Sequence, residues 1–225
     1  MSSLRATPVL PVPSVGTHGS VDLRLNDDQD IDPNKGVIGL HAPPFVVKNT
    51  IVVGAAPTLA SKGYVRGFDV RTGQRKWIFH TIPRKGEFGY DTWIHPGDAE
   101  QAGNTGVWSE LSADMELGLV YLPVELPTGD FVGIYRQGPA LFGESLVAVD
   151  INTGKRRWHY QTAHHGLWDR DLPCAPLLCA IPPAGKIVKA LAQPSQPGFL
   201  DALDRPTGAP IRPTPQLPVP DGHVP

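Results

Sequence analysis

One stretch of the sequence, from Trp158 to Pro173, combines the side chains that proton transfer needs. Its sixteen positions hold three histidines, two tryptophans and two aspartates. An imidazole titrates near neutral pH, and a carboxylate beside it can orient it or accept a proton itself. Trp168 precedes Asp169 directly, which predicts an apolar wall that makes this carboxylate a better base. The alternative interpretation is a rim loop whose histidines and aromatic rings only fill space.

The elements that would position this stretch follow a repeated pattern. An apolar run, an aspartate, a Thr-Gly pair and a return run occur in this order in Val65–Trp77, Ser145–Trp158 and Phe199–Pro210. The first two copies end on a tryptophan. Each copy predicts a β-hairpin, because glycine accepts a positive φ in the turn and the aspartate can accept hydrogen bonds from turn amides. We expect each tryptophan to pack across a neighbouring sheet.

These repeats predict an all-β fold, a partial β-propeller of four-stranded antiparallel blades with tryptophan-docking repeats. The Thr-Gly pairs are 153 − 72 = 81 and 207 − 153 = 54 residues apart, which indicates loops inserted between blades. Three repeats cannot close a ring, so either partner chains complete it or the sequence is a fragment, and we favour a fragment. The expected domains are an irregular N-terminal segment (1–36), an incomplete propeller (37–212) and a Pro-rich tail (213–225).

Composition limits the class of protein. The 225 residues are 40% hydrophobic and 19% charged, as in a globular protein rather than a disordered one. A formal net charge of −2 argues against a nucleic-acid partner. No run of about 18 apolar residues predicts a membrane span. The N-terminus lacks the apolar core of a signal peptide.

Two further features suggest ligands but are interpreted as structural. Cys174 and Cys179 lie near His164 and His165, which could suggest zinc, yet their spacing lacks the tight turn of a metal knuckle. A disulfide between them stays open, and two half-buried thiols in a strand are favoured. The acidic residues 26–32 lack the glycine and final glutamate of a calcium loop, so we predict a solvated loop.

On these residues, the chain resembles the pyrroloquinoline-quinone (PQQ) dependent dehydrogenases, most closely the quinoprotein glucose dehydrogenase branch. The Asp-x-x-Thr-Gly-x-x-x-Trp repeats resemble the family's blade signature. The sequence His165-Gly-Leu-Trp168-Asp169 resembles its His-x-x-Trp-Asp element, and Trp108 in Gly-Asn-Thr-Gly-Val-Trp resembles the tryptophan that lies under the quinone. Their separation, 169 − 108 = 61 residues, agrees with the family arrangement. The resemblance implies a propeller of about eight blades with PQQ on its axis.

The resemblance also implies a reaction, the two-electron oxidation of an aldose sugar or an alcohol. Asp169 would take the hydroxyl proton while hydride passes to the quinone, and His165 would orient Asp169 or contact the substrate. Trp108 would hold the cofactor by stacking. Thr128 lies in the turn where alcohol-oxidising relatives carry a metal-ligating asparagine. Gln196 stands where the family places a cofactor-contacting lysine, so the positive charge is missing. A Ca²⁺ or Mg²⁺ ion would polarise the quinone, but the sequence does not identify its ligands.

The implied setting is the periplasm, with a small-molecule sugar or alcohol as substrate and a membrane quinone pool as electron acceptor. The alternative is a non-catalytic propeller scaffold, similar to outer-membrane assembly proteins with the same repeats, or an inactive truncated homologue. Trp108 and the stretch from His165 to Asp169 favour the enzyme, since a scaffold does not need them. Gln196 and the missing blades favour the alternative.

Overall fold

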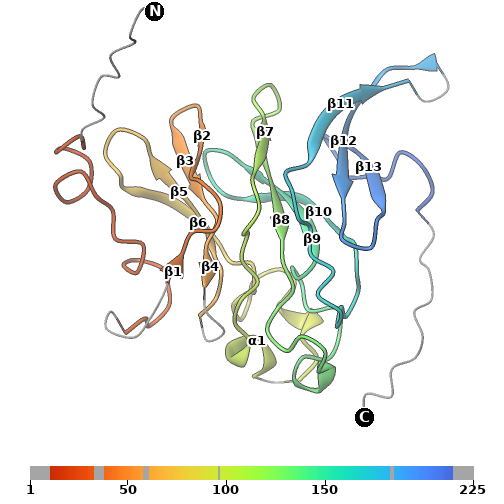
Figure 1. Ribbon diagram of the computed structural model, residues 1–225, viewed down its shortest axis with the longest axis horizontal. Helices are drawn as coiled ribbons and strands as arrows, with labels where there is room; N and C mark the ends of the chain where they lie inside the picture. Colours follow the sequence, from red (N-terminus) through yellow and green to blue (C-terminus); the bar gives the residue numbers. More distant parts are fainter. Residues whose placement is uncertain (1–10, 33–37, 58–60, 96, 183–184, 215–225) are drawn as a thin grey trace, which may run out of the picture.

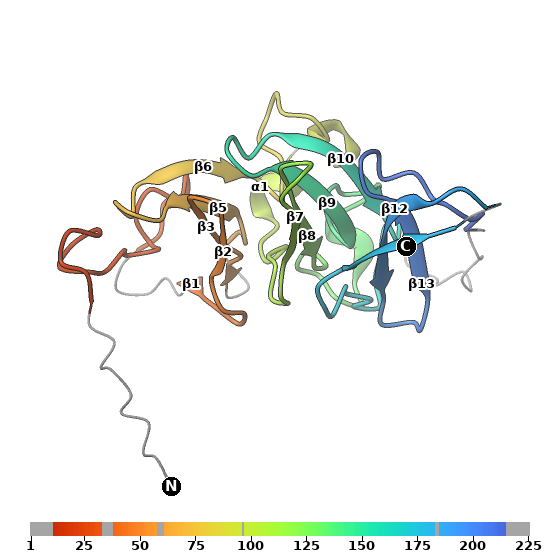
Figure 2. The ribbon, with the colours of Figure 1, turned by 90° about the horizontal axis from the view of Figure 1, so that it is seen from above.

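The computed structural model describes residues 11–32, 38–57, 61–95, 97–182 and 185–214, and these ranges form an all-β structure. Three antiparallel sheets follow one another in the order of the sequence and lie side by side in both views of Figures 1 and 2. Each sheet is built around one copy of the repeated hairpin. The predicted partial propeller of antiparallel blades is therefore confirmed.

Two sheets have four strands each, and the third has three strands among the described residues. The first, in the order β2-β3-β5-β6, consists of β2 (Phe45–Val47), β3 (Thr50–Val53), β5 (Val65–Asp69) and β6 (Arg75–Phe79). The second, in the order β10-β9-β8-β7, consists of β7 (Ser112–Asp114), β8 (Leu119–Val124), β9 (Ser145–Asp150) and β10 (Arg156–Gln161). The third consists of β11 (Leu177–Ile181), β12 (Val188–Pro194) and β13 (Leu200–Asp204).

The remaining elements are short. A two-stranded sheet pairs β1 (Ile38–Gly39) with β4 (Ala56–Pro57). The loop between the first and second sheets contains η1 (Tyr90–Thr92) and α1 (Asp98–Gln101), and the loop between β8 and β9 of the second sheet contains η2 (Gly133–Tyr135). Within the described ranges, no helix has the length and apolar character that a membrane crossing requires.

The second sheet is buried on both faces, which explains the uninterrupted apolar run of β8. All six residues of this strand are buried. Because side chains alternate along a strand, Val120 and Leu122 pack into the cluster shared with the first sheet, whereas Leu119 and Tyr121 pack into the cluster shared with the third. The two apolar clusters therefore lie between successive sheets, and β8 contributes to both.

The Thr-Gly turn of the second sheet receives the tryptophan of the first. The ring of Trp77 packs against Gly154, where an added Cβ would lie 2.6 Å from the indole. The indole Nε1 of Trp77 donates to the carbonyl oxygen of Ile151 at 2.9 Å. Gly154 also has a φ of +67°, which side chains rarely adopt. Glycine is thus required here both for the turn and for the space that the indole fills.

The third sheet repeats the arrangement. A Cβ at Gly208 would lie 2.4 Å from the ring of Trp158, and the Nε1 of Trp158 donates to the carbonyl oxygen of Arg205 at 2.9 Å. The repeat aspartates bind the turns as predicted, since Asp150 Oδ1 accepts a hydrogen bond from the backbone nitrogen of Thr153 at 3.0 Å. The predicted docking role of both tryptophans is confirmed.

At the first sheet, residues 15–29, here called the N-terminal segment, occupy the place of a docking tryptophan. A Cβ at Gly73, in the first Thr-Gly turn, would lie 2.8 Å from Val21 Cγ2 and 3.0 Å from Val15 Cγ1. The backbone nitrogen of Gly16 donates a hydrogen bond of 3.0 Å to the carbonyl oxygen of Thr72, the residue before Gly73. The docking turn of the first blade is therefore covered by this segment.

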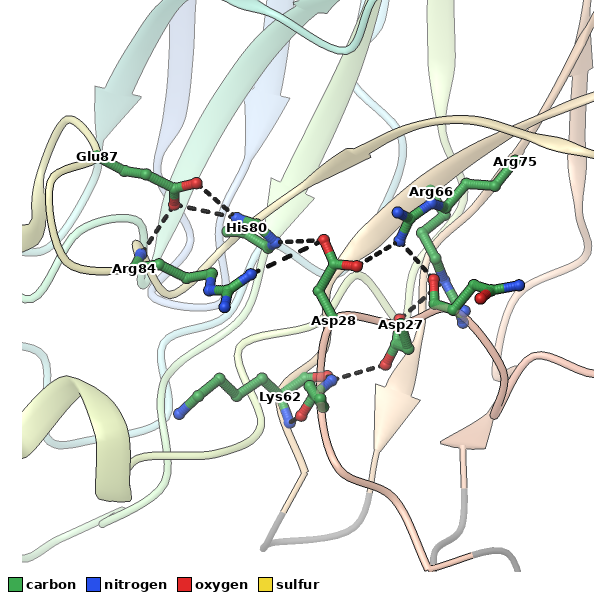
Figure 3. A network of polar contacts seen from close by, with 10 residues as sticks. Asp27, Asp28, Lys62, Arg66, Arg75, His80, Arg84 and Glu87 are labelled. Atoms are coloured by element: carbon green, nitrogen blue, oxygen red, sulfur yellow. Dashed lines mark hydrogen bonds and ion pairs between the residues drawn. The ribbon is translucent and has the colours of Figure 1, made fainter.

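A buried ion pair joins the N-terminal segment to β5 (Figure 3). The Nε of Arg66 lies 3.0 Å from Oδ1 of Asp27, and neither side chain reaches solvent. Burial raises the pKa of Asp27 to about 6, although the charge of Arg66 acts in the opposite direction. The adjacent Asp28 lies 2.9 Å from Arg75 on β6. The predicted solvated loop at 26–32 is therefore wrong for Asp27, because the buried guanidinium of Arg66 needs a carboxylate partner.

The cysteines differ in part from the expectation. Both Cys174 and Cys179 are free and partly buried, so the disulfide that the sequence left open is not formed. Cys179 lies in β11, whereas Cys174 precedes this strand. The prediction of two half-buried thiols in a strand is thus right for Cys179 and wrong for the position of Cys174.

Substitution of a docking glycine tests the contact between blades. We expect Gly154→Ala to lower the free energy of unfolding by about 1–3 kcal/mol more than Gly118→Ala, because the new methyl group collides with Trp77. Gly118 is a matched control, since it has a similar φ of +69° and no atom within 4 Å of an added Cβ. Urea unfolding, followed by circular dichroism, measures the difference. Equal losses in the two variants would contradict the docking role.

Candidate active site

The loop that ends at Trp108 is held between the ends of β3 and β8. The backbone nitrogen of Val107 donates to Ala55, just after β3, at 3.1 Å, and the nitrogen of Glu125, just after β8, donates to Gly106 at 3.0 Å. Position 106 has no room for a side chain, because a Cβ there would lie 1.8 Å from the carbonyl oxygen of Ala55. These contacts bring Trp108 to the junction of the first two sheets.

Asp171 connects Trp108 to the end of β8. Its Oδ2 accepts a hydrogen bond from Trp108 Nε1 and its Oδ1 accepts one from the backbone nitrogen of Leu126, both at 2.8 Å. Its carbonyl oxygen accepts a third from the backbone nitrogen of Gln196, which follows β12, at 3.3 Å. The side chain of Asp171 is buried, whereas Trp108 is half-buried. One residue therefore joins segments from two sheets to the indole.

The loop that carries Asp169 is held by the buried Glu144. The Oε1 of Glu144 accepts a hydrogen bond from the backbone nitrogen of Arg170 at 2.9 Å. Its carboxylate also fills the space in which a Cβ of Gly166 would lie. The buried guanidinium of Arg136 donates to the carbonyl oxygen of Gly166. This packing explains why the predicted His-x-x-Trp-Asp element contains a glycine directly after its histidine.

Asp169 is exposed and has a positive φ of +52°. Burial, followed by the negative charge of Asp169, raises the pKa of Asp130. Trp168 does not enclose Asp169, because its indole is 58% exposed and packs edge-on against Phe131 with 6.1 Å between ring centroids. The structure thus differs from the predicted apolar wall and leaves the carboxylate of Asp169 in solvent.

The other predicted site residues are anchored by their neighbours. The Nδ1 of His165 lies 3.1 Å from the carbonyl oxygen of Gly138, which directs the ring toward the loop after β8. The Oγ1 of Thr128 accepts a hydrogen bond from the backbone nitrogen of Gly103 at 2.9 Å, which ties this turn to the Trp108 loop. The side chain of Gln196 is exposed, and its backbone is bound to Asp171.

Three buried carboxyl groups surround this junction and titrate near neutral pH. Burial, followed by the charge of nearby carboxylates, raises the pKa of Glu125 to about 8, that of Glu144 to about 7 and that of Asp171 to about 6. A hydrogen bond of 2.6 Å from the backbone nitrogen of Gly106 to Glu125 opposes the rise without cancelling it. The junction can therefore hold protons close to the exposed carboxylate of Asp169.

Sequence reasoning missed four residues of this site: Asp171, Glu125, Glu144 and Arg136. Asp171 lies within the stretch from Trp158 to Pro173, but nothing in its spacing indicates that it binds an indole 63 residues earlier. Glu125 has a recognisable signal, because it directly follows the wholly apolar strand β8. An acid at the end of a strand that is buried on both faces is itself expected to be buried.

Comparison with known proteins gives the class of the chain. The family model described as "PQQ: Glucose/ethanol/alcohol dehydrogenase, beta-propeller domain" matches residues 1–225. The chain therefore belongs to the family of PQQ-dependent β-propeller dehydrogenases, and the resemblance seen in the sequence is confirmed.

Individual relatives agree with this class. The chain is 34% identical over 218 residues to the quinoprotein glucose dehydrogenase of Gluconobacter oxydans, covering 93% of this chain and 26% of that protein. Its structure is similar to a quinohemoprotein alcohol dehydrogenase from Pseudomonas putida, with a TM-score of 0.70, 32% identity, and coverage of 78% of this chain and 27% of that one. A europium-containing methanol dehydrogenase gives a TM-score of 0.68 at 28% identity, with coverage of 75% and 32%. The chain thus spans about a quarter to a third of the length of these relatives.

The pKa of Glu125 predicts how stability depends on pH. Because this pKa rises from its usual 4.5 to about 8, the folded protein retains a proton that the unfolded chain releases between these values. The free energy of unfolding therefore falls as the pH rises from about 5 to about 8. We expect Glu125→Gln to make this fall shallower, because glutamine keeps an acceptor for Gly106 and carries no charge.

Urea unfolding at pH 5, 6, 7 and 8 measures how steeply the free energy of unfolding falls with pH in the unaltered protein and in the variant. Glu110→Gln is the control, since Glu110 is exposed. An undiminished slope in Glu125→Gln would show that this carboxyl does not bind the proton.

Proposed function

We propose that this chain takes part in the PQQ-dependent oxidation of an aldose sugar, such as a glucose-like substrate, or of an alcohol, with Asp169 as the base. The observation that carries the proposal is the juxtaposition of an exposed carboxylate and a fixed indole. Asp169 lies two residues before the aspartate that binds Trp108. Membership of the family supports the cofactor. The activity is proposed for the whole enzyme, because this chain covers only 26% of the length of its glucose dehydrogenase relative.

The residues around Trp108 fit a flat aromatic quinone. The indole of Trp108 is half-buried and its edge is held by a hydrogen bond, so it offers a rigid surface for stacking. Thr128 and Gln196 lie on segments bound to the same junction and would donate hydrogen bonds to polar edges of the cofactor. Gln196 would do so without the positive charge that the family's lysine supplies. When bound, PQQ supplies the acceptor for hydride.

Asp169 would accept the hydroxyl proton as hydride leaves the same carbon. The substrate then loses one proton and one hydride, and its C–O single bond becomes a carbonyl group. Because Asp169 is exposed, the proton can pass on to solvent. We propose that His165 contacts the substrate rather than orienting Asp169, since its Nδ1 already lies at the carbonyl oxygen of Gly138.

An aromatic pair beside Asp169 supports a substrate with an apolar face. Phe131 and Trp168 are 63% and 58% exposed and contact each other edge-on. Sites for small molecules combine aromatic walls with a few polar groups, and a sugar ring presents both C–H and hydroxyl groups. This pair, with Asp169, favours an aldose over a short alcohol.

A divalent cation, Ca²⁺ or Mg²⁺, would polarise the quinone. Among the described residues, no three His, Cys, Asp or Glu side chains are grouped closely enough to bind a metal, so these side chains do not form a complete ligand set. We also propose a periplasmic location and a membrane quinone pool as electron acceptor. Both rest only on membership of the family.

Binding of PQQ to the full chain tests the role of Trp108. We expect PQQ to quench the tryptophan fluorescence in a saturable manner, and Trp108→Phe to weaken binding by about tenfold, a loss in the range of aromatic stacking on a flat ring. Trp168→Phe is the matched control, because it also removes one indole from this end of the molecule but should leave the affinity unchanged. Equal affinities for the unaltered protein and Trp108→Phe would contradict stacking.

Dye reduction by the PQQ-loaded chain, with a panel of sugars and alcohols, tests the role of Asp169. We expect Asp169→Asn to lower kcat by about 100-fold or more while the affinity for PQQ stays unchanged, because general-base catalysis contributes about that factor. Asp130→Asn, which removes a neighbouring carboxylate, is the control and should retain most of the activity. No dye reduction with any substrate, together with no quenching by PQQ, would rule out the proposed reaction.

A further inference from the structure

We infer that Asp171 is a positioning residue that fixes the plane of Trp108 relative to Asp169. This inference rests on the proposed function, because it concerns how the same site holds its aromatic surface. Asp171 would not touch substrate or cofactor. It would act through the indole that it binds.

The hydrogen bonds of the Asp171 carboxylate fix the edge of the indole. Both carboxylate oxygens of Asp171 are used, one by Trp108 Nε1 and one by the backbone nitrogen of Leu126, each at 2.8 Å. The N–H group of an indole lies in the plane of the ring, so its acceptor holds the edge and leaves the faces free for stacking. Since the backbone at Leu126 continues from β8, the indole is fixed to the most buried strand of the structure.

A second hydrogen bond joins the two segments one residue further along each of them. The Oγ of Ser109 donates to the carbonyl oxygen of Leu172 at 3.1 Å. Residues 108–109 are therefore bound to residues 171–172 at two successive positions. Because Asp169 lies on the same short segment as Asp171, Asp169 cannot move far from Trp108 without breaking these bonds.

The charges around Asp171 also affect how strongly it can hold the indole. The charges that act on Asp171 are two carboxylates, Asp169 on its own loop and Asp130 after β8, while the N–H groups of Leu126 and Trp108 act in the opposite direction. Asp171 in turn acts on the buried Glu125 and Glu144. Burial, followed by the charges of Asp169 and Asp130, raises the pKa of Asp171 to about 6. Protonation turns one acceptor oxygen into a donor, so the hold on the indole should weaken below this pH.

Substitution tests the inference in the full chain loaded with PQQ. Asn at position 171 keeps one acceptor oxygen, so Asp171→Asn can satisfy the indole or Leu126, but not both. We expect its affinity for PQQ to fall about tenfold, as for the loss of one hydrogen bond to a charged group. In the Trp108→Phe background the same change should have no effect, since the two residues act as one unit. Asp201→Asn is the matched control, because Asp201 is also buried and accepts a hydrogen bond, from Tyr160.

A second measurement does not need the cofactor. The indole N–H resonance of Trp108, identified by its loss in Trp108→Phe, should shift with pH with a midpoint near 6. It should become independent of pH in Asp171→Asn. A resonance of Trp108 that does not titrate, or equal losses of PQQ affinity in Asp171→Asn and Asp201→Asn, would overturn the positioning role. Absence of quenching in the unaltered protein would instead refute the proposed function and leave the resonance as the test of Asp171.

Discussion

The arrangement of the sheets depends on one contact, an indole that fills the space left by a glycine without a side chain. Trp77 on Gly154 and Trp158 on Gly208 each combine this packing with one hydrogen bond from Nε1 to a backbone carbonyl. The apolar clusters between sheets are non-directional, because burial of apolar surface alone permits many relative positions. The tryptophan contacts are directional, because each joins one indole to one turn of the next sheet through close packing and a hydrogen bond. These contacts place the second sheet against the first and the third against the second.

The candidate site is a consequence of that placement. The loop before Trp108 passes between the ends of β3 and β8 only because Gly106 leaves room beside Ala55. The resulting junction is too crowded for water to solvate the acids that end the buried strands, which explains the raised pKa values of Glu125 and Glu144. The exposed Asp169 stands at the edge of this crowded region. Buried carboxyl groups with raised pKa values and an exposed carboxylate thus lie on segments that the same junction holds together.

The sequence was sufficient to predict the features that depend on local pattern. The hairpins around Asp69 and Asp150, the docking of Trp77 and Trp158, and the propeller architecture follow from residues close together in the chain. Features that depend on distant partners were not predictable. Asp27 seemed a solvated acid because its partner Arg66 lies 39 residues away on a strand. The role of Asp171 was hidden for the same reason, since the sequence around it does not reveal which indole it binds.

The N-terminal segment at Gly73 shows what the docking turn recognises. Two valines and a backbone amide satisfy there a turn that elsewhere accepts a tryptophan. At this turn, aliphatic side chains fill the space beside the glycine, and the backbone donor bonds to Thr72 rather than to the residue after the aspartate, as the indoles do. The outer turn of the first sheet is consequently covered by aliphatic side chains and backbone of its own chain, where an indole covers the same turn in the two sheets that follow.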